Sequence, residues 1–383
     1  MNLEHLKATF KSLFHADPLV VRSPGRINII GEHTDYNEGF VMPAAIDKAI
    51  YVGISKRDDH EVHLFSESYQ KLDVSSIKDL KKSDNDWANY ILGVADQIQK
   101  RGYILGGFNF YIDGDVPLGA GLSSSAAVEC ATGYALDQLF GLSISKMDIA
   151  LIGQKAEQIF AGVNCGIMDQ FASVFGKKDH AIMLDCRSMK YIYIPLELDG
   201  YKLVLLNTNV KHSLADSAYN KRRAACEQGV EWVKEKFPNV NSLRDVDLSM
   251  LEAYVKPKDL DVYTKCSFVV QEIGRLLNAA EQLKNGNLPA LGKLMFETHK
   301  GLSEDYQVSC AELDFLVDAV KDLEYVLGAR MMGGGFGGCT INIVKEENID
   351  DLIENLTAQY AEKFGLKLGA YTVTTDMGTS VVS

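Results

Sequence analysis

The chain has 383 residues, which is more than one hydrophobic core usually organises, so we expect two domains. Hydrophobic residues make up 46% of the chain, charged residues 24%, and only 8 prolines occur, a composition that excludes long disordered or low-complexity stretches. The formal net charge is -13 and no long run of Lys and Arg occurs, which argues against nucleic acid and anionic membranes as partners.

The N-terminal segment and the cysteines bear on where the protein is located. Hydrophobic residues recur at helical spacing over residues 3–13, which predicts an amphipathic helix that ends near Asp17 and Pro18. This segment lacks the apolar centre of an export signal, and no run of eighteen apolar residues occurs. The 7 cysteines are widely spaced and form no CxxC or Cys/His cluster. We therefore expect a soluble cytoplasmic protein with reduced thiols and no structural zinc.

Further elements are predicted in chain order. β-Branched and aromatic residues indicate strands at 19–21, 27–30, 49–55, 61–65 and 107–112, with a helix at 88–99. Two more helices, 123–140 and 145–160, each begin at a serine, which is a good N-cap residue. Next come strands at 181–185, 191–195 and 202–207, a mostly helical stretch at 215–324, a glycine-rich turn, a strand at 339–344, a helix at 349–364 and a strand at 370–375. Strands and helices in blocks, without strict alternation, predict an α+β fold.

The first motif is the segment RSPGRINIIGEHTDYN at residues 22–37, where polar groups crowd around one strand and the loop after it. A polyhydroxylated ligand needs several donors and acceptors at fixed positions, because each buried hydroxyl must regain the hydrogen bonds it made with water. Glu32, His33 and Asp35 could supply them. The competing interpretation is a charged, solvated turn between strands.

The second motif is DVPLGAGLSSSAA at residues 115–127, a glycine-bearing loop that runs into a helix. Unpaired backbone N–H groups and the helix dipole make such a junction an anion site, and serine hydroxyls add donors or a magnesium ligand. The segment is not a Walker A loop, because no GK[ST] closes it. An ordinary capped helix start is the alternative.

The third motif is MGGGFGGC at residues 332–339, where five glycines precede a β-branched strand. Glycines permit positive φ angles and the close approach of a ligand or of another backbone segment. A tight hairpin-like turn is the alternative interpretation.

Together, in this order, the three motifs resemble the GHMP small-molecule kinases, a family named for galactokinase, homoserine kinase, mevalonate kinase and phosphomevalonate kinase. The segment GRINIIGEHTDYNEGFVMP at residues 25–43 is similar to the signature of the galactokinase branch nearly residue for residue. Similarity continues through residues 87–90, 165–171 and 209–214 to Tyr219 and residues 222–223, so it covers most of the chain.

The resemblance implies a two-domain α+β fold with substrates in the cleft between the domains. Residues 1–195 would form an N-terminal domain like the second domain of ribosomal protein S5, and residues 196–383 a ferredoxin-like C-terminal domain. The implied activity is transfer of a phosphoryl group from ATP to the anomeric C1 hydroxyl of galactose, with Mg²⁺ as cofactor. The implied partners are galactose and ATP, and we expect a monomer.

The resemblance also implies roles for individual residues. Asp169 would accept, or at least orient, the proton of the anomeric hydroxyl, and Arg26 would offset negative charge on the phosphates and on Asp169. The implied galactose contacts are Glu32, His33, Asp35, Gly166, Asp169 and Tyr219. The implied ATP contacts are Trp87, Tyr90, Gly119, Ala120, Gly121, Leu122, Ser123, Ser124 and Ser125. Ser125 and Glu157 would hold magnesium.

Two alternatives stay open from the sequence. A related GHMP sugar kinase that acts on N-acetylgalactosamine or arabinose shares all three motifs. A non-catalytic galactose sensor is expected to have gaps in the serine-rich loop, and here LSSSAA at residues 122–127 is unbroken, which favours an enzyme. Glu157 would otherwise suit a solvated helix face, and Trp87 would suit simple packing.

Overall fold

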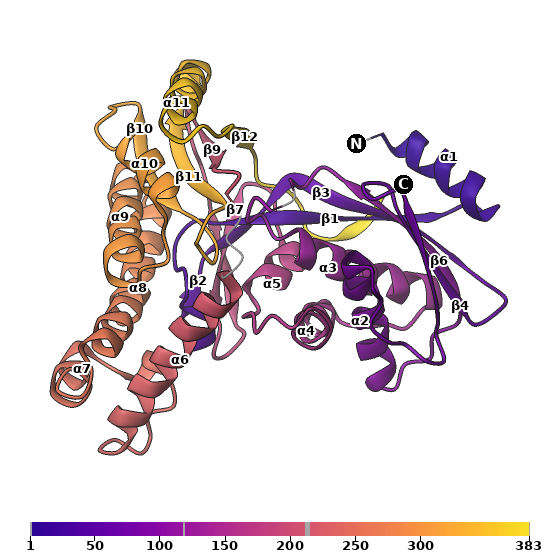
Figure 1. Cartoon of the computed structure of the whole chain (residues 1–383), viewed down its shortest axis with the longest axis horizontal. Helices are drawn as coiled ribbons and strands as arrows, with labels where there is room; N and C mark the ends of the chain where they lie inside the picture. Colours follow the sequence, from indigo (N-terminus) through magenta and orange to yellow (C-terminus); the bar gives the residue numbers. More distant parts are fainter. Residues whose placement is uncertain (1, 118, 211–214, 383) are drawn as a thin grey trace.

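The computed structural model describes residues 2–117, 119–210 and 215–382 (Figure 1). Leu118 and residues 211–214, which belong to segments of the family resemblance, lie outside the described residues. A strand-rich part with four helices beneath its sheet lies on one side of Figure 1, and a second sheet with long helices lies on the other. The α+β class predicted from the sequence is confirmed.

A six-stranded sheet forms the centre of the first part. Its strand order is β13-β1-β3-β6-β4-β5, and every neighbouring pair is antiparallel except β4 with β6. The bounds are β1 (Leu19–Asn28), β3 (Pro43–Lys56), β4 (Glu61–Ser66), β5 (Lys71–Ser76), β6 (Phe108–Gly114) and β13 (Ser380–Val382). Because β13 pairs with β1, the last described strand belongs to the sheet that the first strand begins.

Helices cover both faces of this sheet. Helix α1 (Leu3–Phe14) buries Leu6 and Phe10 in a small cluster with Val20 and Tyr111. The opposite face carries α2 (Asp86–Lys100), α3 (Ser124–Phe140), α4 (Lys146–Ala156) and α5 (Met168–Phe175), as Figure 1 shows. Helix α3 is rich in alanine, and small side chains let it pack closely against β1 and β3.

The second part contains a four-stranded antiparallel sheet in the order β10-β11-β9-β12. Its strands are β9 (Tyr201–Asn207), β10 (Val326–Met331), β11 (Cys339–Lys345) and β12 (Gly369–Val373). Its helices are α6 (Ala215–Lys234), α7 (Leu248–Tyr254), α8 (Leu260–Lys284), α9 (Leu288–Lys300), α10 (Ala311–Asp318) and α11 (Ile349–Phe364). A three-stranded sheet of β2 (Phe40–Val41), β7 (His180–Asp185) and β8 (Tyr191–Pro195) completes the strands.

The largest apolar core runs through both parts. Leu205, Ile341 and Val373 of the second sheet belong to the same buried cluster as Ile27 and Ile54 of the first. Burial of apolar surface is the main driving force of folding, so this shared cluster ties the two parts together. The division of the chain at residue 195 stays a prediction.

Most of the predicted elements are present, and the differences have local causes. The segments 19–21 and 27–30 lie in or next to one strand, β1, and the predicted helix 145–160 is α4 followed by a π turn at Glu157–Ala161. Ser145 caps its helix by accepting a hydrogen bond from Asp148 N at 3.1 Å. Ser123 does not cap α3: its φ is 58° and its hydroxyl bonds to Asp169 instead. Strands β2, β5, β10 and β13 and helix α5 were not predicted.

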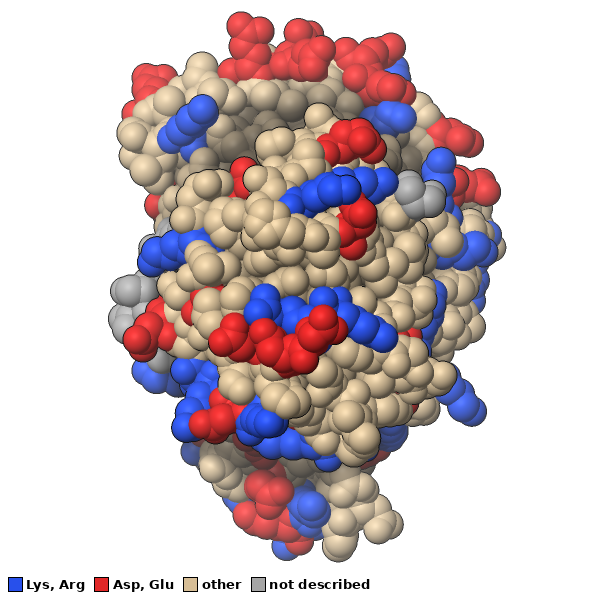
Figure 2. All heavy atoms as spheres, turned by 90° about the vertical axis from the view of Figure 1, so that its right-hand side faces the viewer, with Lys and Arg blue, Asp and Glu red and all other residues tan. Residues whose placement is uncertain are grey.

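Figure 2 shows the end of the molecule that lies at the right of Figure 1. Basic and acidic side chains lie beside one another across the middle of this face, and acidic side chains gather along its upper edge. Among the residues that the model describes, no helix combines the length and the hydropathy needed to cross a membrane.

Candidate active site

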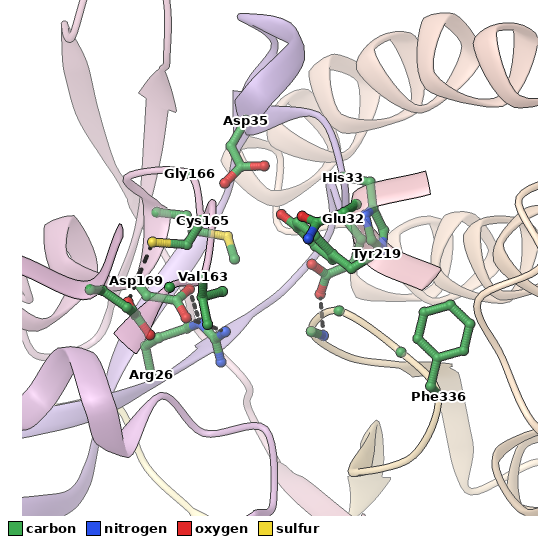
Figure 3. Close-up of a pocket in the computed structure, with 17 residues that line it drawn as sticks. Arg26, Glu32, His33, Asp35, Val163, Cys165, Gly166, Asp169, Tyr219 and Phe336 are labelled. Carbon is green, nitrogen blue, oxygen red and sulfur yellow. Dashed lines mark hydrogen bonds and ion pairs between the residues drawn. The ribbon is translucent and has the colours of Figure 1, made fainter. Parts of the chain in front are cut away.

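A cavity of about 280 Å³ brings together residues from both parts of the molecule (Figure 3). The first part contributes the segment of the first motif and the loop before α5, and the second part contributes α6 and the glycine-rich turn. The lining residues are Arg26, Glu32, His33, Asp35, Glu157, Gly162, Val163, Cys165, Gly166, Met168, Asp169, Tyr219, Asn220, Gly333, Gly334, Gly335 and Phe336.

An irregularity in β1 turns Arg26 toward this cavity. The pairing register between β1 and β3 shifts between Pro24 and Arg26, as in a β-bulge, which re-aims side chains. Gly25 permits this because a Cβ at that position would lie 2.8 Å from the carbonyl oxygen of Leu122. The backbone of the second motif therefore lies directly against β1, where Arg26 Nη1 donates a hydrogen bond to Gly121 O at 2.6 Å.

Arg26 and Asp169 form a bidentate ion pair in the cavity wall. Arg26 Nε lies 2.7 Å from Asp169 Oδ1, and Arg26 Nη2 lies 2.8 Å from Oδ2. The Arg26 side chain is 5% exposed and that of Asp169 29%, so only the carboxylate is open to a ligand. The hydroxyl of Ser123 also donates to Asp169 Oδ2. Paired donors of this kind fix the orientation of a carboxylate. The Asp169 carboxylate is thus held in place to orient a hydroxyl or to accept its proton.

Asp35 approaches the same cavity from the first motif, where it begins a 3₁₀ turn at Asp35–Asn37. Burial raises the pKa of the Asp35 carboxyl to about 6, and the carboxylates of Asp169 and Glu32 act in the same direction. Gly166 makes room for it, since a Cβ on Gly166 would lie 1.7 Å from Asp35 Oδ2. Asp35 is therefore ionised at neutral pH, and its carboxylate can accept hydrogen bonds from a ligand.

Glu32 is held by an arginine that sequence reasoning did not single out. Arg330, at the end of β10, is fully buried, and its Nη2 lies 3.0 Å from Glu32 Oε1. The backbone N–H of Gly333 donates to the same oxygen at 2.9 Å. Arg330 also donates to the carbonyl oxygens of Asn28, Ile29 and Met331. Glu32 Oε1 is therefore occupied, and Oε2 is the oxygen left for a ligand.

A second buried charge holds the loop of the first motif from the other side. Glu272 of α8 is fully buried, and its Oε1 accepts a hydrogen bond from Gly31 N at 2.9 Å. Arg275 Nε lies 2.7 Å from Glu272 Oε2, and the hydroxyl of Thr298 donates to the same carboxylate. The segment from Asn28 to Glu32 thus begins at the last residue of β1, in the first sheet, but side chains of the second part hold it in place.

His33 lies beside Tyr219 in the cavity (Figure 3), with ring centroids 5.3 Å apart. Its Nδ1 is 2.9 Å from the hydroxyl of Tyr36. Burial lowers the pKa of His33 to about 4, although the carboxylate of Glu32 opposes this shift. Its Nε2 is buried and makes no hydrogen bond of ordinary geometry within the described part of the chain. His33 is therefore a neutral imidazole at neutral pH.

A neighbouring cavity of about 370 Å³ contains most of the predicted nucleotide contacts. It is lined by Ile50, Ser66, Ser68, Tyr69, Asp86, Trp87, Tyr90, Ile112, Asp113, Gly114, Val116, Gly119, Ser124, Ser125 and Val128. Trp87 and Tyr69 stack with an interplanar angle of 11°, and Trp87 Nε1 is buried without a hydrogen-bond partner among the described residues. A flat aromatic wall with an unused donor suits a heteroaromatic ring.

Ser125 and Glu157 lie at the boundary of the two cavities, with Ser125 Oγ 3.0 Å from Glu157 Oε1. Burial raises the pKa of Glu157, and the Asp169 carboxylate adds to the shift. Gln170 Nε2 donates to Glu157 Oε2 at 2.7 Å and to Glu129 Oε2 at 2.9 Å. Sequence reasoning did not assign a role to Gln170 or Glu129. Glu129 lies inside helix α3, and the residues around it in the chain do not indicate its contact with Gln170.

The structure thus places most of the predicted site residues in one of two cavities and leaves four of them outside both. The predicted galactose contacts, Arg26 and Glu157 all line the first cavity. Trp87, Tyr90, Gly119, Ser124 and Ser125 line the second. Ala120 and Leu122 are buried in the core, while Gly121 and Ser123 bond to Arg26 and Asp169, so these four residues line neither cavity.

Family models match three segments of the chain. The galactokinase galactose-binding signature matches residues 8–56. The GHMP kinase N-terminal domain matches residues 89–177, and the GHMP kinase C-terminal domain matches residues 279–362. The first two segments include Arg26, Glu32, Asp35 and Asp169, and the third includes Arg330.

Similar proteins extend over nearly the whole chain. A galactokinase of Clostridium acetobutylicum is 44% identical over 96% of this chain and 96% of its own length. A galactokinase of Thermotoga maritima is 42% identical over 91% of this chain and 95% of its own length. The crystal structure of Lactococcus lactis galactokinase complexed with galactose superposes with a TM-score of 0.95 at 35% identity, covering 99% of this chain and 100% of that one. Mevalonate kinase of Methanococcus jannaschii, at 18% identity and a TM-score of 0.67, shares the fold. The chain belongs to the galactokinase family of the GHMP kinases.

Proposed function

We propose that the protein transfers the γ-phosphoryl group of ATP to the anomeric hydroxyl of galactose. The observation that carries this proposal is the Arg26–Asp169 pair, which lies in a cavity that also presents Glu32, His33 and Asp35. Phosphoryl transfer depends mainly on positioning and on charge stabilisation, and this cavity offers one carboxylate for the nucleophile and one guanidinium beside it. The family membership of the chain agrees with this proposal.

In the proposed reaction the oxygen on C1 of galactose attacks the γ-phosphorus. The bond between this oxygen and phosphorus forms, the bond from phosphorus to the β–γ bridging oxygen breaks, and the C1 hydroxyl proton passes to Asp169. Arg26 keeps the Asp169 carboxylate oriented and offsets negative charge beside the reacting oxygens. Glu32 and Asp35 accept hydrogen bonds from other hydroxyls of the sugar and so hold C1 in line.

The residues at the boundary of the two cavities suit a magnesium ion. Ser125 and Glu157 offer a hydroxyl and a carboxylate 3.0 Å apart, and Mg²⁺ prefers such hard oxygen ligands, usually one or two from the protein. We propose that these two side chains bind the Mg²⁺ that accompanies ATP. Bound there, the ion would neutralise charge on the phosphates.

The metal proposal predicts a shared effect of two substitutions. Ser125→Ala and Glu157→Ala should each raise the Mg²⁺ concentration needed for half of the maximal rate, and the double variant should do little more, because both ligands serve one ion. Kinase rates measured over a Mg²⁺ titration at saturating ATP test this. Unchanged Mg²⁺ dependence in both single variants would exclude these residues as ligands.

Gly166 gives a sharp test of the sugar site. Gly166→Ala should weaken galactose binding by about 10- to 100-fold, because the new methyl group would displace the Asp35 carboxylate that lies 1.7 Å from its position. Calorimetric titration with galactose measures the loss. Gly274→Ala is the matched control, because Gly274 is exposed on α8 with no atom within 4 Å of its added Cβ. Equal affinities of the two variants would contradict the proposed place of the sugar.

A substrate panel tests the proposed function directly. ATP consumption is measured with galactose, N-acetylgalactosamine, arabinose, glucose and mevalonate. We expect the highest kcat/KM with galactose and a much lower value with its C4 epimer glucose, because buried polar groups that lose their matching hydroxyl are left unpaired. A higher kcat/KM for another sugar would identify a related sugar kinase, and galactose binding without turnover would identify a sensor.

A further inference from the structure

A buried glutamine lies between two glutamates next to the two cavities. Gln170 follows Asp169 in helix α5, but it is fully buried and lines neither cavity. Its Nε2 lies 2.7 Å from Glu157 Oε2 and 2.9 Å from Glu129 Oε2. Both glutamates are buried as well, Glu129 in α3 and Glu157 in the π turn that follows α4. One amide nitrogen therefore joins three helical elements of the first part.

The neighbours of the Gln170 amide determine its orientation. An amide nitrogen can only donate, and its two protons suffice for the two carboxyl groups beside it. Glu157 also receives the hydroxyl of Ser125, 3.0 Å from Oε1, and the thiol of Cys165, 3.4 Å from Oε2. The reverse orientation of the amide would place its oxygen against this carboxylate. Gln170 is therefore the donor and Glu157 the acceptor.

Packing alone does not account for a glutamine at position 170. Gln170 Oε1 and Glu129 Oε1 are buried and make no hydrogen bond within the described part of the chain. A buried polar atom without a partner costs about 1–3 kcal/mol, which an apolar side chain of similar size would avoid. Gly153 of α4 leaves room for the pair, since a Cβ there would lie 3.2 Å from Gln170 Cγ and from Glu129 Cβ. The hydrogen bonds that Gln170 donates are what distinguishes it from a side chain that fills space.

The two carboxylate oxygens of Glu157 have different partners. Oε2 accepts from Gln170 and Cys165, whereas Oε1 accepts from Ser125 at the boundary of the two cavities. A hydrogen bond to one oxygen of a metal-binding carboxylate orients the other oxygen toward the metal. We propose that Gln170 is a positioning residue that holds Glu157 Oε2, with Glu129 as its second anchor, and so presents Oε1 to the Mg²⁺ that accompanies ATP. This inference rests on the metal site of the proposed function.

Asp169 and Gln170 then have separate tasks although they are neighbours in the chain. The Asp169 carboxylate is held by the side chains of Arg26 and Ser123, neither of which contacts the Gln170 amide in a hydrogen bond. Loss of the Gln170 amide should therefore weaken metal binding and leave sugar binding unchanged. A purely structural role would instead disturb both, because Asp169 and Gln170 lie in the same short helix.

Metal binding can be measured without turnover. Mn²⁺ replaces Mg²⁺ as the probe, and electron paramagnetic resonance gives its Kd for the full-length protein saturated with a non-hydrolysable ATP analogue. Gln170→Met keeps the length of the side chain and removes the donor. It should raise the Kd for Mn²⁺ about tenfold, as expected when a hydrogen bond that orients a metal ligand is lost. The Kd for galactose, measured by calorimetric titration, should stay at the wild-type value.

Variants of Glu129 and a matched control complete the test. Glu129→Met removes the second anchor and should raise the Kd for Mn²⁺ by a smaller factor, whereas Glu129→Gln retains an oxygen that can accept from Gln170 and should restore the wild-type value. Gln97→Met is the control. Gln97 of α2 is also buried and donates to a carboxylate, that of Asp96 at 2.8 Å, but it lies outside both cavities, so its loss should leave Mn²⁺ binding unchanged.

The Glu157→Ala variant separates failure of this inference from failure of the metal site. If Glu157→Ala weakens Mn²⁺ binding but a folded Gln170→Met variant binds Mn²⁺ like the wild type, the positioning role is refuted and the metal site stands. If Glu157→Ala also binds Mn²⁺ like the wild type, the metal site is refuted and the inference falls with it. An equal loss of galactose affinity in Gln170→Met would overturn the inference in favour of a structural role. Should Gln170→Met not fold, unchanged Mn²⁺ binding in Glu129→Met would overturn it.

Discussion

Asp169→Asn should lower kcat with galactose by about 10²- to 10⁴-fold, the range for a positioned acid–base group, while ATP binding stays largely intact. Asparagine keeps the size of the side chain but replaces one carboxylate oxygen with a donor that would face Arg26 or Ser123, both of which also donate. Galactose binding should change less than turnover. Steady-state kinetics and calorimetric titration with galactose measure the two effects separately.

The chain offers a matched control for this substitution. Asp148 also accepts hydrogen bonds from one arginine and one serine, Arg101 at 2.6 Å and Ser145 at 2.7 Å, but it lies at the start of α4, outside both cavities, and its arginine is 36% exposed where Arg26 is 5% exposed. Asp148→Asn should leave kcat unchanged. A folded Asp169→Asn variant with near-normal turnover would refute the catalytic role. A loss confined to KM would mean that Asp169 stabilises the bound substrate and the transition state equally.

Arg330→Met is the second substitution from which we expect a large effect. It would leave the Glu32 carboxylate, which is 2% exposed, as a buried charge without its partner. Breaking a buried ion pair on one side costs about 3–5 kcal/mol of stability. Galactose affinity should fall as well, because Glu32 would no longer be held toward the cavity. Denaturant unfolding and calorimetric titration at pH 7 measure both losses.

Two further variants show whether the Arg330 effect comes from the pair with Glu32. Adding Glu32→Gln to Arg330→Met should recover part of the lost stability, because the unpaired charge is removed. Arg101→Met breaks a pair in which the two side chains are 36% and 42% exposed, so it should cost less than about 1 kcal/mol. A similar cost for Arg330→Met would contradict the role given to the buried pair.

The sequence was most informative where functional side chains follow one another along the chain. Arg26, Glu32, His33 and Asp35 lie within ten residues, and the fold brings all four to one cavity. Arg330 and Glu272 could not be predicted in the same way. Each lies in an otherwise ordinary strand or helix, and its partner in the first motif lies more than 200 residues away in the chain. A buried charge indicates a partner only once the fold shows that the charge is buried.

Local rules also failed where a distant group competed with them. A serine before a helix predicts an N-cap, which holds for Ser145. Ser123 instead adopts a φ of 58° and donates to Asp169, 46 residues further along the chain. Helix α5, which carries Asp169, is only 8 residues long, too short for hydrophobic periodicity to identify. Local secondary-structure propensity therefore predicts poorly the conformation around Ser123 and Asp169, the residues nearest the proposed chemistry.

The fixing of the first motif by Arg330 and Glu272 has a consequence for biosynthesis. Arg330 lies 301 residues after Ile29, to whose carbonyl oxygen it donates. During translation five strands of the first sheet, β1, β3, β4, β5 and β6, can emerge and pair long before Glu272 and Arg330 leave the ribosome, and only β13 follows later. Until then Glu32 has no counter-charge and Gly31 N has no acceptor, so the nascent loop stays hydrated and outside the core. Ligand recognition therefore matures late on the ribosome, after most of the scaffold around it has been made.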